Sequence, residues 1–222
     1  MAEVLLSSTE QEQLFYGADL SWLAAGIGAV QKTIQVWRKQ CLTETGDDPL
    51  LYMTARIKSA DSMRTKLLRL GKRPTAANAL TAVHDAAGVR AVALFTDDVY
   101  RLAEALSGAQ GMRIVQAKDY IAQPKPSGYR SYHLIAEQLV SRPEGQRLVT
   151  VEIQLRTIAM DTWAALEHEI QYKQDVPEQE LICAELKRCA DEIASTELSM
   201  QTIRELIAQR RSGRDADIIS RR

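Results

Sequence analysis

The first part of the chain has the hydrophobic spacing of a helix. Between residues 9 and 45, apolar side chains recur every three or four positions, at Leu20, Leu23, Ile27, Val30, Ile34 and Trp37. This is the period of one helix face. Thr9 and Glu12 fit a capping box at its start, and the segment GDDP (46–49) carries a glycine and a proline that end a helix. The pattern predicts N-terminal helices over residues 1–48.

The middle of the chain, residues 49–175, alternates between helical and strand patterns. Helices are predicted near residues 60–70, after Pro74, and from Asp97 to about Leu106. Strands are predicted at residues 89–95, 112–119, 131–140 and 148–156. The first of these strands is an almost unbroken apolar run, which is typical of a strand buried on both faces. The last two are joined by a short polar turn, which predicts an antiparallel hairpin. The alternation predicts an α/β (α+β) fold.

The end of the chain is helical, with Pro177 in the first turn of a last helix over residues 176–211. Apolar and small side chains there follow alternating steps of four and three residues, at Ile182, Leu186, Cys189, Ile193, Thr196, Met200, Ile203 and Ile207. We call these eight positions the α-helical seam. A seam of this kind either packs on its own domain or forms a contact between subunits. Residues 212–222 are predicted to be a flexible tail.

Composition narrows the class of protein without identifying it. The chain has 222 residues, enough for one domain, and 45% of them are hydrophobic. The net charge is −1, so any anion site must come from locally placed cations. Its 3 cysteines do not form a CxxC pair, which argues against a disulfide framework and against zinc. No signal peptide or apolar stretch of membrane-spanning length is found, and we expect a cytoplasmic protein.

Charged and polar side chains stand where a buried sheet would make them costly. Glu152, Gln154 and Arg156 alternate along one face of the strand 148–156. They are either a solvent-facing surface or a functional face whose charges need partners. Asp85 precedes a buried strand that itself contains Arg90, so it is either part of a helix end or a carboxylate presented at a strand end.

Two further segments contain candidate phosphate ligands. In the segment 55–62, Arg56 and Lys58 lie two residues apart and Ser62 follows, which fits either a phosphate site or a solvated helix start. The loop 124–133 (PKPSGYRSYH) is stiffened by two prolines.

That loop could form a turn between strands or the wall of a pocket. Lys125 and Arg130 can bind phosphates, Tyr129 offers a flat face for a base, and His133 begins a strand. Farther on, Arg156 and Asp161 fall where a strand gives way to a helix, whose N-terminus favours anions.

The helix that follows has both an apolar and a charged set of positions. Its apolar positions are predicted to be core, at Trp163, Leu166 and Ile170, and its charged run is predicted to be a solvated face, at Glu167, His168 and Glu169. The charged run lacks the HExxH spacing of a zinc site.

Taken in order, four of these segments resemble one known family. RIKSADS, HDAAGVR, KDYIAQPKPSGYRSYH and VEIQLRTIAMDTWAALEHEIQYK are similar to the synthetase domain of the RelA/SpoT family over about residues 50–175. Because the chain has no room for further domains, it resembles the small alarmone synthetases of the RelQ and RelP type. The resemblance implies a nucleotidyltransferase-like fold with a mixed, mostly antiparallel sheet of about five strands flanked by helices. It also implies a single synthetase domain over residues 1–222.

The resemblance also implies a reaction. The family transfers the β,γ-pyrophosphate of ATP to the 3′-hydroxyl of GDP or GTP, which gives ppGpp or pppGpp and AMP in the stringent response. It implies Mg²⁺ held by Asp85 and Glu152, with Glu152 also a candidate to accept the hydroxyl proton. The ATP side is implied to consist of Arg56, Lys58, Ser62 and Arg90. The GDP or GTP side is implied to consist of Lys125, Tyr129, Arg130, His133, Gln154, Arg156 and Asp161.

Several features depart from the family or remain open. Tyr132 stands where leucine is frequent and Arg130 where lysine is frequent, and Gln116 gives no basis for choosing between GDP and GTP. Family members suggest a homotetramer and, in some cases, activation by the alarmone through a segment near residues 52–54. Whether the protein binds RNA is left undetermined.

Two other functions are compatible with parts of the sequence. One is a toxic relative that pyrophosphorylates adenosine nucleotides or tRNA 3′ ends, against which the guanine-side residues Tyr129 and Asp161 argue. The other is an inactive nucleotide- or RNA-binding regulator, against which the retained carboxylates Asp85 and Glu152 argue.

Overall fold

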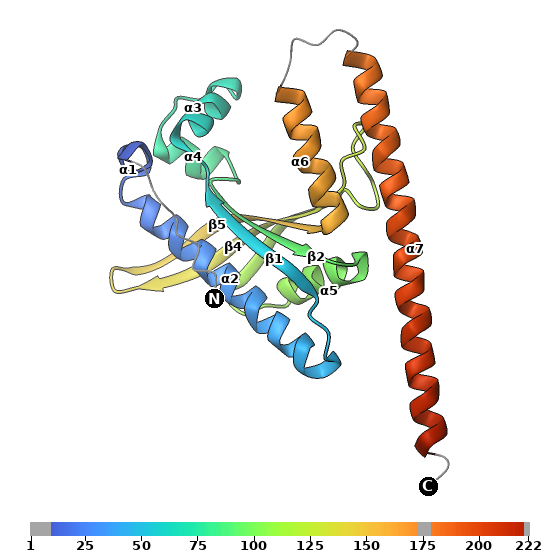
Figure 1. The fold of residues 1–222 in the computed structure, drawn as a ribbon. Helices are drawn as coiled ribbons and strands as arrows, with labels where there is room; N and C mark the ends of the chain where they lie inside the picture. The colour runs from blue at the N-terminus through green and yellow to red at the C-terminus, as the bar shows by residue number, and fades with distance from the viewer. Residues whose placement is uncertain (1–9, 173–178, 220–222) are drawn as a thin grey trace. The chain divides into compact units, whose positions relative to one another are not determined.

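The computed structural model describes residues 10–172 and 179–219 (Figure 1). Its elements are α1 (Glu10–Tyr16), α2 (Asp19–Thr45), β1 (Leu50–Ile57), α3 (Ala60–Arg69), α4 (Ala76–Ala82), β2 (Ala87–Ala93), α5 (Thr96–Ser107), β3 (Met112–Asp119), β4 (Tyr132–Arg142), β5 (Gly145–Thr157), α6 (Ile158–Tyr172) and α7 (Gln179–Ile219). Thr9 and Pro177, which were predicted to begin helices, lie outside the described residues. Among the described helices, none is both long and apolar enough to cross a bilayer.

The contacts divide the chain into two compact units. The first contains the residues up to Gln123 together with Ser131–Ile158, and the second contains Pro124–Arg130 and the chain from Ala159 onward. Residues 124–130 of the loop 124–133, the candidate pocket wall, thus belong to the second unit, although the chain on both sides of them belongs to the first. That residues 1–222 act as a single synthetase domain stays a prediction.

A five-stranded sheet forms the centre of the first unit, in the order β1-β2-β5-β4-β3. Only the pairing of β2 with β5 is parallel, and the other three pairs are antiparallel. This confirms the mixed, mostly antiparallel sheet, and the predicted hairpin of β4 and β5. The fifth strand, β1, was not located from the sequence.

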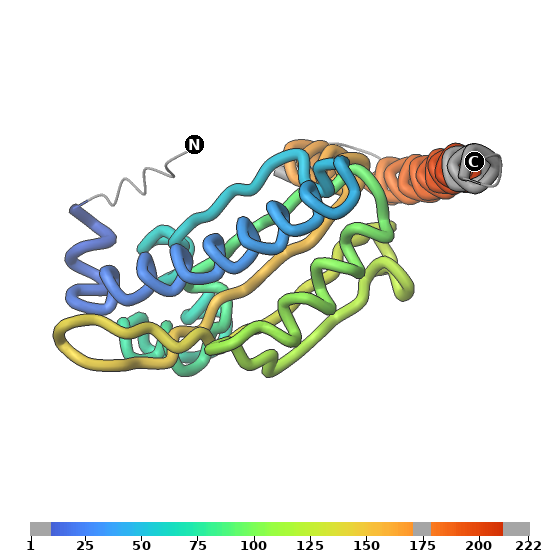
Figure 2. Tube along the Cα trace, turned by 90° about the horizontal axis from the view of Figure 1, so that it is seen from below, coloured from blue at the N-terminus to red at the C-terminus, as the bar shows by residue number. Residues whose placement is uncertain are grey.

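Two helices cover one face of this sheet. α2 and α5 lie on the same side of the strands (Figure 2). Apolar side chains of both helices share one core with the strands, including Ile27, Val30, Leu102, Val89 and Ile153. Residues that alternate with this set point to the opposite face. The sequence is therefore apolar on the covered face and polar on the other.

The N-terminal helical region is divided in two by Gly17. Its φ of 55° lies in the left-handed region, which glycine adopts without steric cost. Tyr16, at the end of α1, is only 1% exposed and donates a hydrogen bond from its hydroxyl to the carbonyl of Lys58, at 2.8 Å. The break therefore places α1 against the connection between β1 and α3.

The second unit is built on α6 and α7, which run alongside each other (Figure 1). Trp163 is buried against α7 and donates from its indole nitrogen to the carbonyl of Leu186, at 3.0 Å. The prediction that Leu166 and Ile170 are core is wrong, because they are 56% and 39% exposed. α6 buries only one narrow stripe. The backbone of α7 stays helical through Ile219, beyond the predicted end near residue 211.

Candidate active site

The register of the sheet places the predicted polar residues in two adjacent rows. Arg56 of β1 lies opposite Gly88 of β2, which lies opposite Glu152 of β5. The next row aligns Arg90 with Gln154. Because residues paired across strands project from the same face, these side chains all point away from the helix-covered core. The interpretation of Glu152 and Gln154 as a functional face is thus consistent with the fold.

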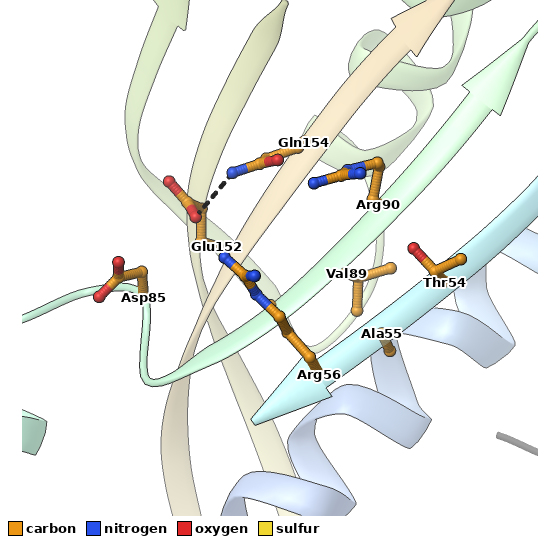
Figure 3. A pocket seen from close by; sticks show the side chains of 9 residues that line it. Thr54, Ala55, Arg56, Asp85, Val89, Arg90, Glu152 and Gln154 are labelled. Carbon is orange, nitrogen blue, oxygen red and sulfur yellow. Dashed lines mark hydrogen bonds between the residues drawn. The ribbon is translucent and has the colours of Figure 1, made fainter. Parts of the chain in front are cut away.

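A cavity of about 240 Å³ opens on this face. Its lining residues are Thr54, Ala55, Arg56, Asp85, Gly88, Val89, Arg90, Glu152 and Gln154. Figure 3 shows the side chains of β1, β2 and β5 projecting toward one another, with Asp85 on the segment that leads into β2. Five of these lining residues were candidate site residues in the sequence, and they span almost one hundred positions of the chain. They are Arg56, Asp85, Arg90, Glu152 and Gln154.

Asp85 is the more strongly neutralised of the two carboxylates. Its Oδ2 accepts hydrogen bonds from the ammonium groups of Lys58, at 3.0 Å, and Lys66, at 2.8 Å. Burial raises the pKa of Asp85, but the two lysines outweigh burial and hold the pKa below its usual value. Its Oδ1 is buried and accepts no hydrogen bond from any described residue. One oxygen of an ionised carboxylate is thus available to a ligand.

Glu152 is held between an amide and an imidazole. Gln154 donates from Nε2 to Oε2 at 3.0 Å, and Nδ1 of His133 lies 3.5 Å from Oε1. Burial raises the pKa of Glu152, and so does the charge of Asp85. The hydrogen bond and charge of His133, helped by Gln154, reverse this and leave the pKa below its usual value. Glu152 is therefore ionised at neutral pH.

The two carboxylates fit a hard cation. No group of three or more His, Cys, Asp and Glu side chains among the described residues could hold a metal by itself. Mg²⁺, however, commonly uses one or two protein carboxylates and completes its shell with water and substrate phosphates. The unsatisfied Oδ1 of Asp85 and the ionised carboxylate of Glu152 have the chemistry of such a pair.

Helix α3 carries candidate phosphate-binding groups, and Lys66 of this helix reaches Asp85 of the pocket. Ser59 caps it by accepting from the backbone N–H of Ser62, at 3.3 Å, and donates to the hydroxyl of Ser62, at 2.8 Å. Lys58 precedes this cap and Lys66 follows it on the same helix. Sequence reasoning missed Lys66. Its spacing of four residues from Ser62, which places both on one helix face, was the available signal.

The predicted acceptor residues are divided between the two units. In the first unit, His133 pairs with Gln154 across β4 and β5. Arg156, only 5% exposed, donates to the amide oxygen of Gln154 at 3.3 Å. The structure therefore brings His133, Gln154 and Arg156 together on the face of the pocket.

In the second unit, the ammonium group of Lys125 lies 4.6 Å from the ring centre of Tyr129. Asp161 is buried in the first turn of α6. Arg130 donates to the carbonyl of Ala190, at 2.7 Å, and to the carboxylate of Asp191, at 3.2 Å. That Lys125, Tyr129, Arg130 and Asp161 complete the acceptor site stays a prediction.

Tyr132, which stands where leucine is frequent in the family, does not project from the pocket face of the sheet. Tyr132 pairs with Leu155, so its side chain is on the covered side of the sheet. There its ring packs edge-to-face on Tyr100, with centroids 5.7 Å apart. The substitution of a tyrosine for the frequent leucine is accommodated by core packing.

Comparison with known proteins gives one consistent result. The model of the region found in RelA/SpoT proteins matches residues 55–177. GTP pyrophosphokinase YwaC of Bacillus subtilis is 45% identical over 66% of this chain and 70% of its own length. GTP pyrophosphokinase YjbM of the same organism is 34% identical over 73% of this chain and 77% of its own length.

Solved structures agree with these sequence relatives. Small alarmone synthetase 2 of B. subtilis superposes with a TM-score of 0.75 at 36% identity, over 85% of this chain and 98% of that one. Small alarmone synthetase 1 of B. subtilis bound to its product pppGpp gives a TM-score of 0.76 at 30% identity, over 85% and 96% of the two chains. Since both the sequence match and the fold cover most of the chain, this protein belongs to the RelA/SpoT family.

Proposed function

We propose that this protein is a (p)ppGpp synthetase, a GTP/GDP diphosphokinase. It transfers the β,γ-pyrophosphate of ATP to the 3′-hydroxyl of GDP or GTP. The observation that carries the proposal is the pocket in which the ionised carboxylates of Asp85 and Glu152 share one wall with Arg56 and Arg90. Family membership, and relatives that are themselves GTP pyrophosphokinases, support the same reaction.

Positioning and charge neutralisation provide most of the catalysis in such a transfer. Arg56 and Arg90, from neighbouring strands, are placed to hold the adenine ring, because a guanidinium plane stacks on aromatic rings. Lys58, Lys66 and Ser62 lie where the ATP phosphates would extend along α3. Attack by the 3′-hydroxyl on the β-phosphorus forms the new ester bond and releases AMP.

Asp85 and Glu152 are the residues that would hold Mg²⁺, which would neutralise phosphate charge and orient the pyrophosphate. Glu152 is also the candidate to accept the proton of the attacking hydroxyl. His133 and Gln154 fix the orientation of its carboxylate. On the acceptor side, Tyr129 would stack on guanine, while Asp161 would read its edge. Lys125, Arg156 and His133 would face the acceptor ribose and phosphates.

A direct assay tests the reaction. Purified protein with Mg²⁺, γ-³²P-labelled ATP and either GDP or GTP is expected to give labelled ppGpp or pppGpp on thin-layer chromatography. Label found only on adenosine acceptors or on tRNA would overturn the choice of acceptor. Nucleotide binding without transfer would indicate the inactive regulator instead. Running GDP and GTP in parallel measures the preference between them.

We further propose a homotetramer that works in the cytoplasm. The exposed apolar side chains in the second half of α7 support self-association. Activation by the alarmone stays a prediction.

A further inference from the structure

Arg130 is bound to the protein itself. Its Nη1 donates to the carbonyl oxygen of Ala190, at 2.7 Å, and its Nη2 donates to Oδ1 of Asp191, at 3.2 Å. The side chain is only 17% exposed. A carbonyl at a mid-helix position has one lone pair left after the helical hydrogen bond, and Arg130 uses it. A guanidinium fixed in this way is poorly placed to follow a phosphate.

The neighbouring glycine is packed against the same turn of α7. Gly128 has a φ of 91°, which L-residues with a side chain rarely adopt. A Cβ on Gly128 would lie 2.6 Å from the Cβ of Ala190 and 3.3 Å from the Cα of Lys187. The loop backbone therefore touches α7 with no space for even a methyl group, and Ala190 is the small residue that permits this approach.

The ring of Tyr129, between these two residues, completes the contact. Tyr129 packs against a small buried cluster that consists of Trp163 and Ala164 of α6 and Ala190 of α7. Three partly buried side chains of α7 pack against the same cluster, namely Leu186, Cys189 and Ile193. Lys187 donates to Asp191 at 2.7 Å, so the carboxylate that accepts from Arg130 is itself held. Three consecutive loop residues thus contact one turn of α7 through a close backbone approach, an apolar cluster and a charged pair.

We propose that this turn of α7, centred on Ala190 and Asp191, positions the loop 124–130 for the nucleotide acceptor, and that Arg130 is a positioning residue rather than a phosphate ligand. The inference rests on the proposed function, because the loop is taken to bind GDP or GTP. It adds a role for a helix that lies beyond the region matched by the family model, which ends at residue 177. It also replaces the phosphate role that the resemblance implied for Arg130.

The two roles of Arg130 predict opposite effects of a change at Asp191. If Arg130 bound an acceptor phosphate, removing the competing carboxylate would leave GDP affinity unchanged or raise it. If α7 positions the loop, removing the carboxylate loosens the loop and lowers GDP affinity. A charge-assisted hydrogen bond at this exposure supports an expected loss of about three- to tenfold.

The experiment measures binding of GDP and of the non-transferring analogue α,β-methylene-ATP by calorimetry, for the full-length wild type, Asp191→Asn and Ala190→Leu. GDP is titrated in the presence of the saturating analogue. Asp191→Asn is expected to raise the dissociation constant of GDP about three- to tenfold, and Ala190→Leu about tenfold or more, since leucine fills the space that Gly128 occupies. Both are expected to leave the analogue's dissociation constant within about twofold of the wild type.

Glu185→Gln is the matched control. It removes the same charge from the same helix, but Glu185 pairs only with Arg188 among the described contacts of its side chain, and it is expected to change neither constant. Unchanged GDP binding in both α7 variants, or equal loss for GDP and the analogue, would overturn the inference. Thermal melts of each variant identify unfolding, and Asp191→Asn, a surface change, tests the idea even if Ala190→Leu does not fold. A wild type that makes no (p)ppGpp would instead reject the proposed function.

Discussion

Glu152 lies on the pocket face of the sheet, and two neighbouring side chains keep its carboxylate ionised. His133 and Gln154 both contact its carboxylate. Glu152→Gln keeps the shape of the side chain but removes the negative charge. We expect (p)ppGpp synthesis to fall by at least about a hundredfold, the size of effect that general-base and charge-stabilising groups commonly have. The free energy of unfolding, measured by urea denaturation, should change by no more than about 1 kcal/mol. Normal turnover by this variant would remove Glu152 from the proposed chemistry.

The shifted carboxylates also predict how stability depends on pH. Asp85 has a lower pKa in the folded protein than its ordinary value, so the folded state binds fewer protons than the unfolded state in the pH range between them. Its contribution to stability is therefore complete above the ordinary pKa of about 3.9 and is lost as pH falls through the lower folded value.

Asp85→Asn tests this dependence. At pH 7 we expect a loss of about 1–3 kcal/mol of unfolding free energy, because Lys58 and Lys66 are left facing each other without a carboxylate. The difference between wild type and variant should shrink as pH drops below about 4. Urea denaturation at several pH values measures it. A difference that is constant down to pH 3 would contradict the assignment.

Gly88 lines the pocket and has an ordinary strand conformation. It pairs with Arg56 on one side and Glu152 on the other, so any side chain there would enter the pocket. A Cβ would meet only ordinary contacts, with the carbonyl oxygens of Arg56 at 3.8 Å and Glu152 at 3.9 Å. Gly88→Val should therefore fold but raise the KM for ATP at least about tenfold through steric exclusion. Gly108→Val, outside the pocket, is the matched control. An unchanged KM for ATP would show that adenine does not lie over this strand.

At the scale of elements, α1 contacts the segment that is proposed to bind the ATP phosphates. The hydroxyl of Tyr16 is bonded to the carbonyl of Lys58, and the ring of Phe15 lies 5.2 Å from the guanidinium carbon of Arg64 on α3. Burial raises the pKa of Tyr16, as does the charge of Asp85, so the hydroxyl remains a donor throughout the working range. α1 thus restrains the connection that presents Lys58 to Asp85.

Tyr16→Phe removes only this hydroxyl. We expect a loss of about 1 kcal/mol in unfolding free energy, since the partly buried carbonyl of Lys58 loses its partner. We also expect a KM for ATP that rises about two- to fivefold with little change in the KM for GDP. Tyr100→Phe, which removes a comparable hydroxyl bonded to Asp119, should leave the KM for ATP unchanged. If the two changes raised the KM for ATP equally, Tyr16 would have only a structural role.

The sequence predicted most helices and strands but not all of them. Hydrophobic period located the helices and four strands, because buried faces impose a spacing that residues nearby in the chain must follow. It missed β1, an edge strand in which Leu50, Leu51 and Tyr52 stand together and hide the alternation of apolar and polar residues. Polar positions within strands singled out the candidate site residues of the sheet, and the family resemblance supplied their proposed roles. The register that joins them was visible only in the structure.

The partners of Arg130 could not have been predicted in the same way. They lie 60 and 61 positions further along the chain, on a helix whose pattern reports its apolar face and not its contacts with a loop. Leu166 and Ile170 show the converse error. Helical spacing is the same for a position that is buried within the chain and for one that is left exposed in a single copy.

At the scale of the whole molecule, the α-helical seam separates into two parts. Its first part, which includes Leu186, Cys189 and Ile193, packs within the second unit. Its last positions stay exposed in a single chain, with Met200 at 55%, Ile203 at 50% and Ile207 at 50%. The first stretch therefore confirms packing within the domain, and a contact between subunits stays a prediction for the second stretch. The exposed part is apolar surface that association between copies would remove from water.

Changing Ile203 and Ile207 to glutamate places two charges on that surface. If copies associate through it, burying unpaired carboxylates costs more than the contact provides, and the tetramer mass found by light scattering at micromolar concentration should fall to that of a smaller species. Each chain should remain folded, because neither side chain is buried within it. Glu at Thr202 and Arg210, exposed positions of the same helix, gives a control that should keep the wild-type mass. A wild type that is already monomeric would reject the homotetramer, whereas an undiminished mass in the double variant would move the contact to another surface, such as the exposed Leu166 and Ile170 of α6.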